Sequence, residues 1–175
     1  MPLSPLQRLD EKFDCDRGVQ FLQQAALRAP HLQELHVSRL PTSFDQLIRP
    51  LRGLRLLYIA LLESSSLSTE LLQSLASLPL FSELVVRQRF CRPLPFELTL
   101  ETLRCIAGSR SWRLIRLIGH SVSSQLTLPN DVDAHLAERL ADFRVQIEWT
   151  GAFQLARSDG KVVWKRTSLS HARLS

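Results

Sequence analysis

The stretch that decides the fold is Leu32-Gln33-Glu34-Leu35-His36-Val37, in which apolar residues occupy the first, fourth and sixth positions. The same spacing returns four times along the chain, beginning at Leu54, Phe81, Trp112 and Leu140. The intervals between successive copies are 22, 27, 31 and 28 residues. Because each copy ends in alternating apolar residues, each one predicts a short strand with one buried face.

Segments with helical apolar spacing lie between the copies, and four of them carry start signals. Ser43 precedes the first, with Gln46 in the capping-box position three residues on. Ser68 and Thr99 precede the next two, and Asn130 or Asp131 is expected to cap the last. Gly108 is expected to end the helix that follows Thr99 in a left-handed conformation.

Strands and helices that alternate at this spacing predict parallel strands joined by right-handed crossovers. We expect an α/β domain over residues 1–149, with an opening helix over about residues 18–28, and a basic hairpin and tail over residues 150–175. Asp159-Gly160 suits a tight primed turn, and pairing across it places Leu155 opposite Trp164. The hairpin is expected to cap the exposed edge of the last parallel strand.

The repeated phrase resembles the opening of the leucine-rich repeat, L-x-x-L-x-L followed by x-x-N/C-x-L. The resemblance covers about residues 18–149, and the intervals with helical returns are similar to the ribonuclease-inhibitor-like repeats found in the C-terminal part of F-box proteins. It implies a short solenoid of parallel strands with helical returns.

The chain also departs from that family. The family's Asn or Cys position is occupied here by Leu40, Leu62, Arg89 and His120. The buried Asn ladder is therefore missing, and a generic α/β layer with an unrepeated strand order stays open. No F-box pattern is present in the first 30 residues, so no adaptor contact is carried over.

If the strands are parallel and in chain order, the residues between the apolar positions share one concave sheet face. The expected rows across this face are Glu34, Leu56, Glu83, Leu114 and Asp142; then His36, Tyr58, Val85, Arg116 and Arg144; then Ser38, Ala60, Arg87, Ile118 and Gln146. The predicted partner-binding residues are Glu34, His36, Leu56, Tyr58, Glu83, Val85, Arg87, Arg116 and Arg144.

An apolar centre with a charged rim suits a protein partner. We therefore expect a non-catalytic protein–protein interaction module, and the resemblance implies a substrate-recognition part of a larger assembly such as a ubiquitin ligase. Two alternatives stay open. The acidic and basic rows can pair with each other while the C-terminal segment covers the apolar residues, or the chain can be a fragment that is complete only beside another domain.

The net charge of +5 is concentrated at the C-terminal end. Residues 150–175 hold five cations and one anion, and the Arg87–Arg92 stretch holds three Arg and one Phe. These features favour, as the alternative function, nucleic-acid or phosphate binding by the Arg87–Arg92 loop and the basic tail. A solvated surface explains each of these features better.

The composition predicts an ordered protein, since 45% of the residues are hydrophobic, 22% are charged and 35 are leucine. Cys15, Cys91 and Cys105 are widely separated and form no CxxC pair, which favours free thiols in a reducing compartment. The early charges and short apolar runs predict neither a secretory signal nor a spanning helix. We expect an intracellular protein, in the cytoplasm or nucleus, without membrane association.

No motif supports an enzyme. Ser158-x-x-Lys161 has the spacing of an acyl-transfer motif, but Asp-Gly between them favours a turn where that chemistry needs a helix. Asp131-x-Asp133 lacks the further oxygen ligands of a calcium loop, and there is no GxGxxG, Walker or HExxH pattern. We therefore expect no catalytic residues, no cofactor and no bound metal.

Overall fold

The computed structural model describes residues 8–11, 20, 23–24, 29, 31–38, 40, 44–60, 68–87, 96–118, 126–148 and 151–167. The strands are β1 (Arg8–Glu11), β2 (Glu34–Val37), β3 (Leu56–Ile59), β4 (Glu83–Arg87), β5 (Phe96–Glu97), β6 (Leu114–Ile118), β7 (Leu126–Thr127), β8 (Arg144–Ile147), β9 (Gly151–Ser158) and β10 (Lys161–Thr167). The helices are α2 (Phe44–Ile48), α3 (Thr69–Ala76), α4 (Leu100–Gly108) and α5 (Ala134–Arg139). The predicted opening helix over about residues 18–28 lies largely outside the described residues.

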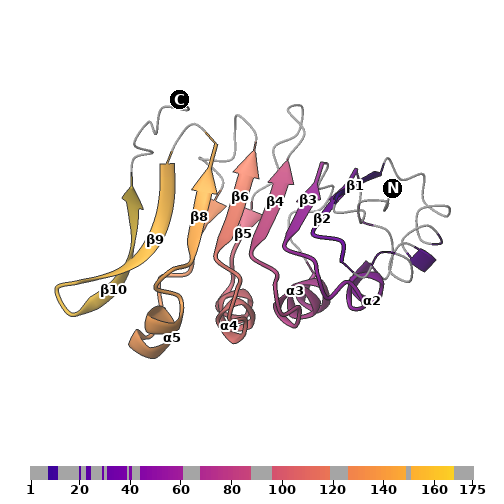
Figure 1. Cartoon of the computed structure of the whole chain (residues 1–175). Coiled ribbons are helices and arrows are strands. Elements are labelled where there is room, and N and C mark those ends of the chain that lie inside the picture. The colour runs from indigo at the N-terminus through magenta and orange to yellow at the C-terminus, as the bar shows by residue number, and fades with distance from the viewer. Residues whose placement is uncertain are drawn as a thin grey trace, which may run out of the picture.

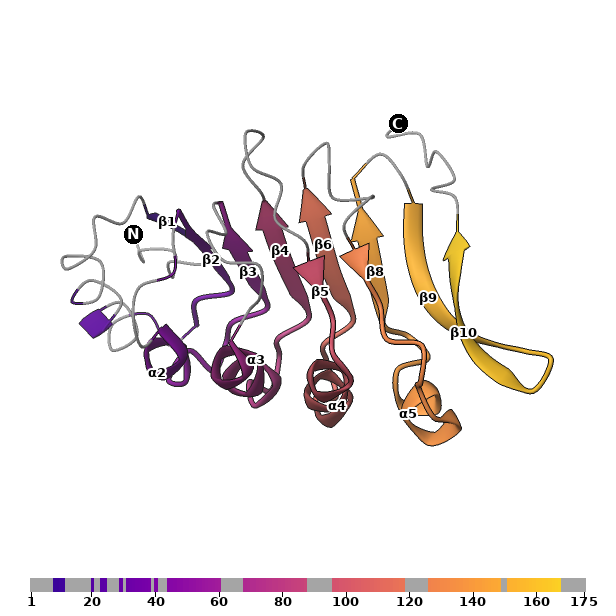
Figure 2. The same cartoon turned by 180° about the vertical axis from the view of Figure 1, so that it is seen from behind.

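The large sheet is open and mostly parallel, which confirms the α/β prediction. Its eight strands follow the order β1-β2-β3-β4-β6-β8-β9-β10, and β5 pairs with β7 in a separate small sheet. The six strands from β1 to β8 are parallel, whereas β9 and β10 are antiparallel to their neighbours. Helices α2 to α5 form one row along the sheet (Figures 1 and 2). None of the helices in the described ranges is long and apolar enough to cross a membrane.

The core lies between the sheet and the row of helices. Two columns of inward side chains cross the parallel strands, each residue at most 1% exposed: Leu35, Leu57, Leu84, Ile115 and Val145, and beside them Val37, Ile59, Val86, Leu117 and Ile147. A third buried column precedes the strands and consists of Leu32, Leu54, Phe81, Trp112 and Phe143. Burying each such side chain contributes about 1.5–3 kcal/mol, so these columns are the main source of stability.

A repeated backbone junction fixes where each strand begins. The carbonyl oxygen of Gln33 accepts hydrogen bonds from the N–H groups of Arg55 and Leu56, at 2.8 and 3.0 Å. The carbonyls of Arg55 and Ser82 each accept two N–H groups from the following unit in the same way. Because the geometry recurs at three successive boundaries, neighbouring strands start level with one another.

Strand β8 departs from this pattern. In each earlier repeat, the first strand residue that faces the core lies three positions after the buried residue before the strand, as Leu35 follows Leu32. In β8, Val145 lies only two positions after Phe143. Val145 therefore pairs with Ile115, where the repeated spacing predicts Phe143. The predicted register was wrong by two residues here, because the apolar phrase also matches the sequence two residues too early, at Leu140, Phe143 and Val145.

Two predicted helix starts, at Ser68 and Thr99, are confirmed, whereas the predicted start at Ser43 lies outside the described residues. The side-chain oxygens of Ser68 and Thr99 accept hydrogen bonds from the N–H groups of Leu71 and Thr102, at 3.2 and 3.1 Å. Each bond satisfies a backbone donor that the first turn leaves without a partner. The predicted left-handed end at Gly108 was wrong, because α4 includes this residue and left-handed glycines in the described ranges occur elsewhere.

The start of α5 corrects a further prediction. Oδ1 of Asp133 accepts a hydrogen bond from the Leu136 N–H at 2.8 Å, so Asp133 is the cap. Asn130 and Asp131 do not cap the helix, because the chain remains non-helical up to Ala134.

The C-terminal hairpin has the predicted turn and register. Asp159 and Gly160 both have positive φ angles, 52° and 77°, as a primed two-residue turn requires. Leu155 pairs with Trp164 across the two strands. Strand β9 in turn pairs with β8, so the hairpin extends the sheet and covers the β8 edge (Figure 1).

Candidate interaction surface

The surface of interest is the face of the large sheet opposite the helices, here called the open face. Its central part, the open-face patch, comprises Glu34, His36, Leu56, Tyr58, Glu83, Val85, Leu114 and Arg116. Strand pairing aligns Glu34, Leu56, Glu83 and Leu114 in a first row and His36, Tyr58, Val85 and Arg116 in a second. For β2, β3, β4 and β6 the structure therefore brings together the residues that the sequence predicts.

An ion pair joins the two rows. Nη2 of Arg116 lies 3.0 Å from Oε1 of Glu83 on the neighbouring strand. Both side chains remain partly accessible, so solvent screening limits the pair to about 1 kcal/mol or less of stability. Its main effect is to restrict the positions of two charged side chains on neighbouring strands of the open face.

A second contact orders the aromatic side of the patch. The rings of His36 and Tyr58 are stacked, with centroids 5.1 Å apart and planes inclined by 21°. Nε2 of His36 lies 3.8 Å from Oε2 of Glu34 on the same strand. The His36 ring therefore packs against one face of the Tyr58 ring, and Tyr58 as a whole is half-buried.

Val85 behaves differently from the other predicted contact residues. It is 4% exposed although it belongs to the open face, because Tyr58 and Arg116 flank it in the same row. A partner that rests on the patch reaches Leu56, Tyr58 and Leu114, which are half-buried, before it reaches Val85. Val85 thus supports the patch from below.

The register of β8 moves three predicted residues. Arg144 stands beside Leu114 in the first row, not beside Arg116, and it is exposed. Gln146 takes the place next to Arg116, and Asp142 precedes the strand and does not belong to the open face. Arg87 lies at the end of β4 opposite Ile118, as predicted.

The sheet continues beyond the predicted rows. Gln154 on β9 pairs with Arg144, and Lys165 on β10 pairs with Gln154, so two of the last three residues in the first row are positively charged. The prediction omitted this extension although the hairpin itself was recognised, because sequence spacing alone did not place the hairpin in the same sheet. At the opposite end Arg8 on β1 pairs with Glu34, so the row runs from Arg8 and Glu34 at one side to Arg144 and Lys165 at the other.

The structure bears only in part on two predicted alternatives, the solvated sheet and the nucleic-acid-binding surface. Glu83 and Arg116 do pair with each other, as the solvated-sheet alternative expects. The described part of the C-terminal segment, however, lies beside β8 in the plane of the sheet, and pairs with that strand. For the nucleic-acid alternative, Arg89 and Arg92 lie outside the described residues, and Arg87 is exposed at a strand end.

Comparison with protein-family models, with curated proteins and with solved structures finds no match to this chain. Within the described residues, no group of three or more His, Cys, Asp and Glu side chains is arranged to hold a metal ion. The geometry of the surface itself is therefore the basis for a functional proposal.

Proposed function

We propose that the protein is a non-catalytic protein–protein interaction module that binds its partner on the open face. We further propose that its architecture is a degenerate leucine-rich-repeat-like solenoid in which the C-terminal hairpin acts as the cap. The strand order and the recurring junction at Gln33, Arg55 and Ser82 support this architecture. In the cell, such a module would serve as the substrate-recognition part of a larger assembly.

The observation that carries the proposal is the combination of accessible apolar side chains with charged side chains already held in place. Leu56 and Tyr58 on β3 and Leu114 on β6 are half-buried, and Glu83, which is paired with Arg116, lies between Leu56 and Leu114. Interfaces typically combine an apolar or aromatic centre with a polar rim, and aromatic and Arg side chains supply much of the binding energy. Ordering these side chains before binding lowers the entropy cost of association.

The deciding experiment uses photo-crosslinking from the full chain. A photoreactive phenylalanine analogue replaces Tyr58 in one version and Leu80, which is 46% exposed between α3 and β4, in the other. We expect one protein to be crosslinked from position 58 and not from position 80. With that protein purified, we expect Tyr58→Ala and Arg116→Glu each to weaken binding at least about tenfold.

Leu80→Ala serves as the matched control because it also removes an exposed apolar side chain, away from the open face. The proposal fails if Leu80→Ala weakens binding as much as Tyr58→Ala while all variants keep the wild-type free energy of unfolding to within about 1 kcal/mol. Binding to labelled RNA or DNA that falls steeply between low and physiological salt, and that is unaffected by Tyr58→Ala, supports nucleic-acid binding instead.

A further inference from the structure

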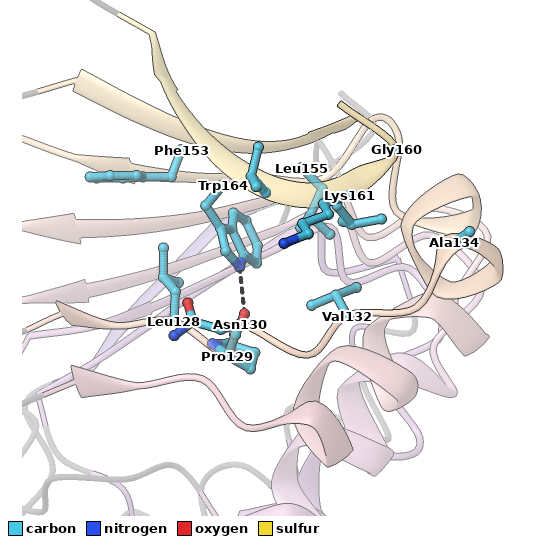
Figure 3. Close-up of a pocket in the computed structure, with 12 residues that line it drawn as sticks. Leu128, Pro129, Asn130, Val132, Ala134, Phe153, Leu155, Gly160, Lys161 and Trp164 are labelled. Atoms are coloured by element: carbon cyan, nitrogen blue, oxygen red, sulfur yellow. Dashed lines mark hydrogen bonds between the residues drawn. The ribbon is translucent and has the colours of Figure 1, made fainter. Parts of the chain in front are cut away.

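A second surface, separate from the open face, lies beneath the hairpin. A cavity of about 730 Å³ opens between the helix side of β9 and β10 and the segment 128–134 (Figure 3). Its walls are mostly apolar, with Val132 and Leu155 buried and Phe153 and Trp164 half-buried. The volume falls within the range of about 300–1,000 Å³ that is usual for binding pockets.

Trp164 is the largest side chain in this cavity and is fixed in orientation. Its indole Nε1 donates a hydrogen bond of 3.1 Å to the carbonyl oxygen of Pro129 (Figure 3). Because the polar atom of the ring is already satisfied, the ring itself offers apolar surface to an occupant without an unpaired donor.

Within the described part of the chain, the cavity is lined by one charged side chain. Lys161 is the single ionisable residue among the described residues that line it, and its side chain extends toward the open space (Figure 3). Residues 151–167 contain four cations and one anion, which gives the hairpin a net charge of +3. The opposite wall segment 128–134 contains Asp131 and Asp133, but neither lines the cavity, so Lys161 beside an apolar wall favours an occupant that carries both apolar side chains and carboxylates.

The position of the cavity indicates the shape of that occupant. Helices α2, α3, α4 and α5 follow one another along the same side of the sheet, each in contact with the next. Helix α5 is the last of the row, and the described part of the hairpin brings no helix of its own to the inner face of β9 and β10 (Figure 2). The cavity therefore lies where a further helix would extend the row beyond α5.

We propose that this cavity is a docking site for an amphipathic helix of a partner protein that presents apolar side chains to Trp164 and Phe153 and a carboxylate to Lys161. The site is independent of the open face, so one protein can contact two partners, or two parts of one partner, on opposite sides of its sheet.

The test uses two labelled helical peptides of equal length. Both carry leucines at i, i+3, i+4 and i+7, and they differ only in having Glu or Lys at the flanking positions. By fluorescence anisotropy we expect the Glu peptide to bind the full chain, with an affinity that falls as salt is added. Lys161→Glu is expected to weaken this binding about tenfold or more, because it replaces attraction by repulsion.

Lys165→Glu is the matched control, since it makes the same charge change on the same strand at a residue that does not line the cavity. The proposal is overturned if the Glu peptide does not bind, if the Lys peptide binds equally well, or if Lys165→Glu weakens binding as much as Lys161→Glu. It is also overturned if sedimentation shows a dimer that Lys161→Glu disperses, because the occupant is then a second copy of the chain.

Discussion

Among single residues, Cys105 on α4 illustrates how packing changes chemistry. The residue is half-buried, and burial raises the pKa of its thiol above the ordinary value. The carboxylate of Glu101, one helical turn earlier, repels the thiolate and raises the pKa further. Since the thiolate is the reactive form, Cys105 is expected to be a slow nucleophile at neutral pH.

We predict that Cys105 in a Cys15→Ser/Cys91→Ser background reacts with iodoacetamide at a higher pH in the folded protein than in denaturant. The same raised pKa means that the unfolded chain releases its proton first, so the free energy of unfolding falls as the pH rises through the ordinary thiol pKa. Denaturation measured across this pH range, with Cys105→Ser as the control, checks the sign. Identical alkylation profiles for the folded and unfolded chains would contradict the prediction.

At the scale of secondary-structure elements, α5 depends on a single capping side chain. We predict that Asp133→Ala lowers the free energy of unfolding by about 0.5–2 kcal/mol, because it removes the acceptor for the Leu136 N–H. Asp131→Ala, an exposed neighbour outside the cap, is expected to change it by less than about 0.5 kcal/mol. Urea denaturation of both variants provides the comparison, and equal effects would exclude the assigned cap.

Two glycines are predicted to respond in opposite directions to the same substitution. Gly160→Ala places a side chain at a φ of +77° in the hairpin turn and is expected to destabilise the protein by about 1–2 kcal/mol. Gly108→Ala at the end of α4 meets open space and is expected to stabilise it by up to about 1 kcal/mol. Thermal or urea unfolding measures both, and a stabilised Gly160→Ala variant would contradict the observed turn.

The parts of the fold that sequence reasoning predicted are those with a strong local pattern. Five of the parallel strands, the caps Ser68 and Thr99 and the hairpin pairing of Leu155 with Trp164 each follow from spacing or turn chemistry. Strand β1 has the sequence Arg-Leu-Asp-Glu, and β5 and β7 are two residues long, so none of them carries a periodic signal.

The surface was predicted less completely because it depends on register. The apolar phrase before β8 matches the sequence two residues too early, which predicts another row for Arg144, and apolar spacing alone does not reveal the shift. The burial of Val85 is set by its neighbours on two other strands, which no local pattern describes.

For the whole molecule, the hairpin closes an edge that the parallel strands leave open. We predict that a chain ending at residue 150 loses several kcal/mol of stability and self-associates, because β8 then presents unpaired backbone groups beside Val145 and Ile147. Size-exclusion chromatography and urea denaturation of the truncated and full chains measure both effects. A truncated chain that stays monomeric and equally stable would show that the hairpin has no protective role.

The shared carbonyl acceptors at Gln33, Arg55 and Ser82 have a consequence for how this protein can change in length. Strands β3, β4 and β6 are each aligned by hydrogen bonds at their own start. The number of residues in the return segment, which connects one strand to the next, therefore does not affect the alignment. Extra residues in a return segment add only a slowly growing loop-closure cost. Peptide tags or whole reporter domains inserted into those returns should therefore leave the strands in line, which makes the returns suitable attachment points for engineering.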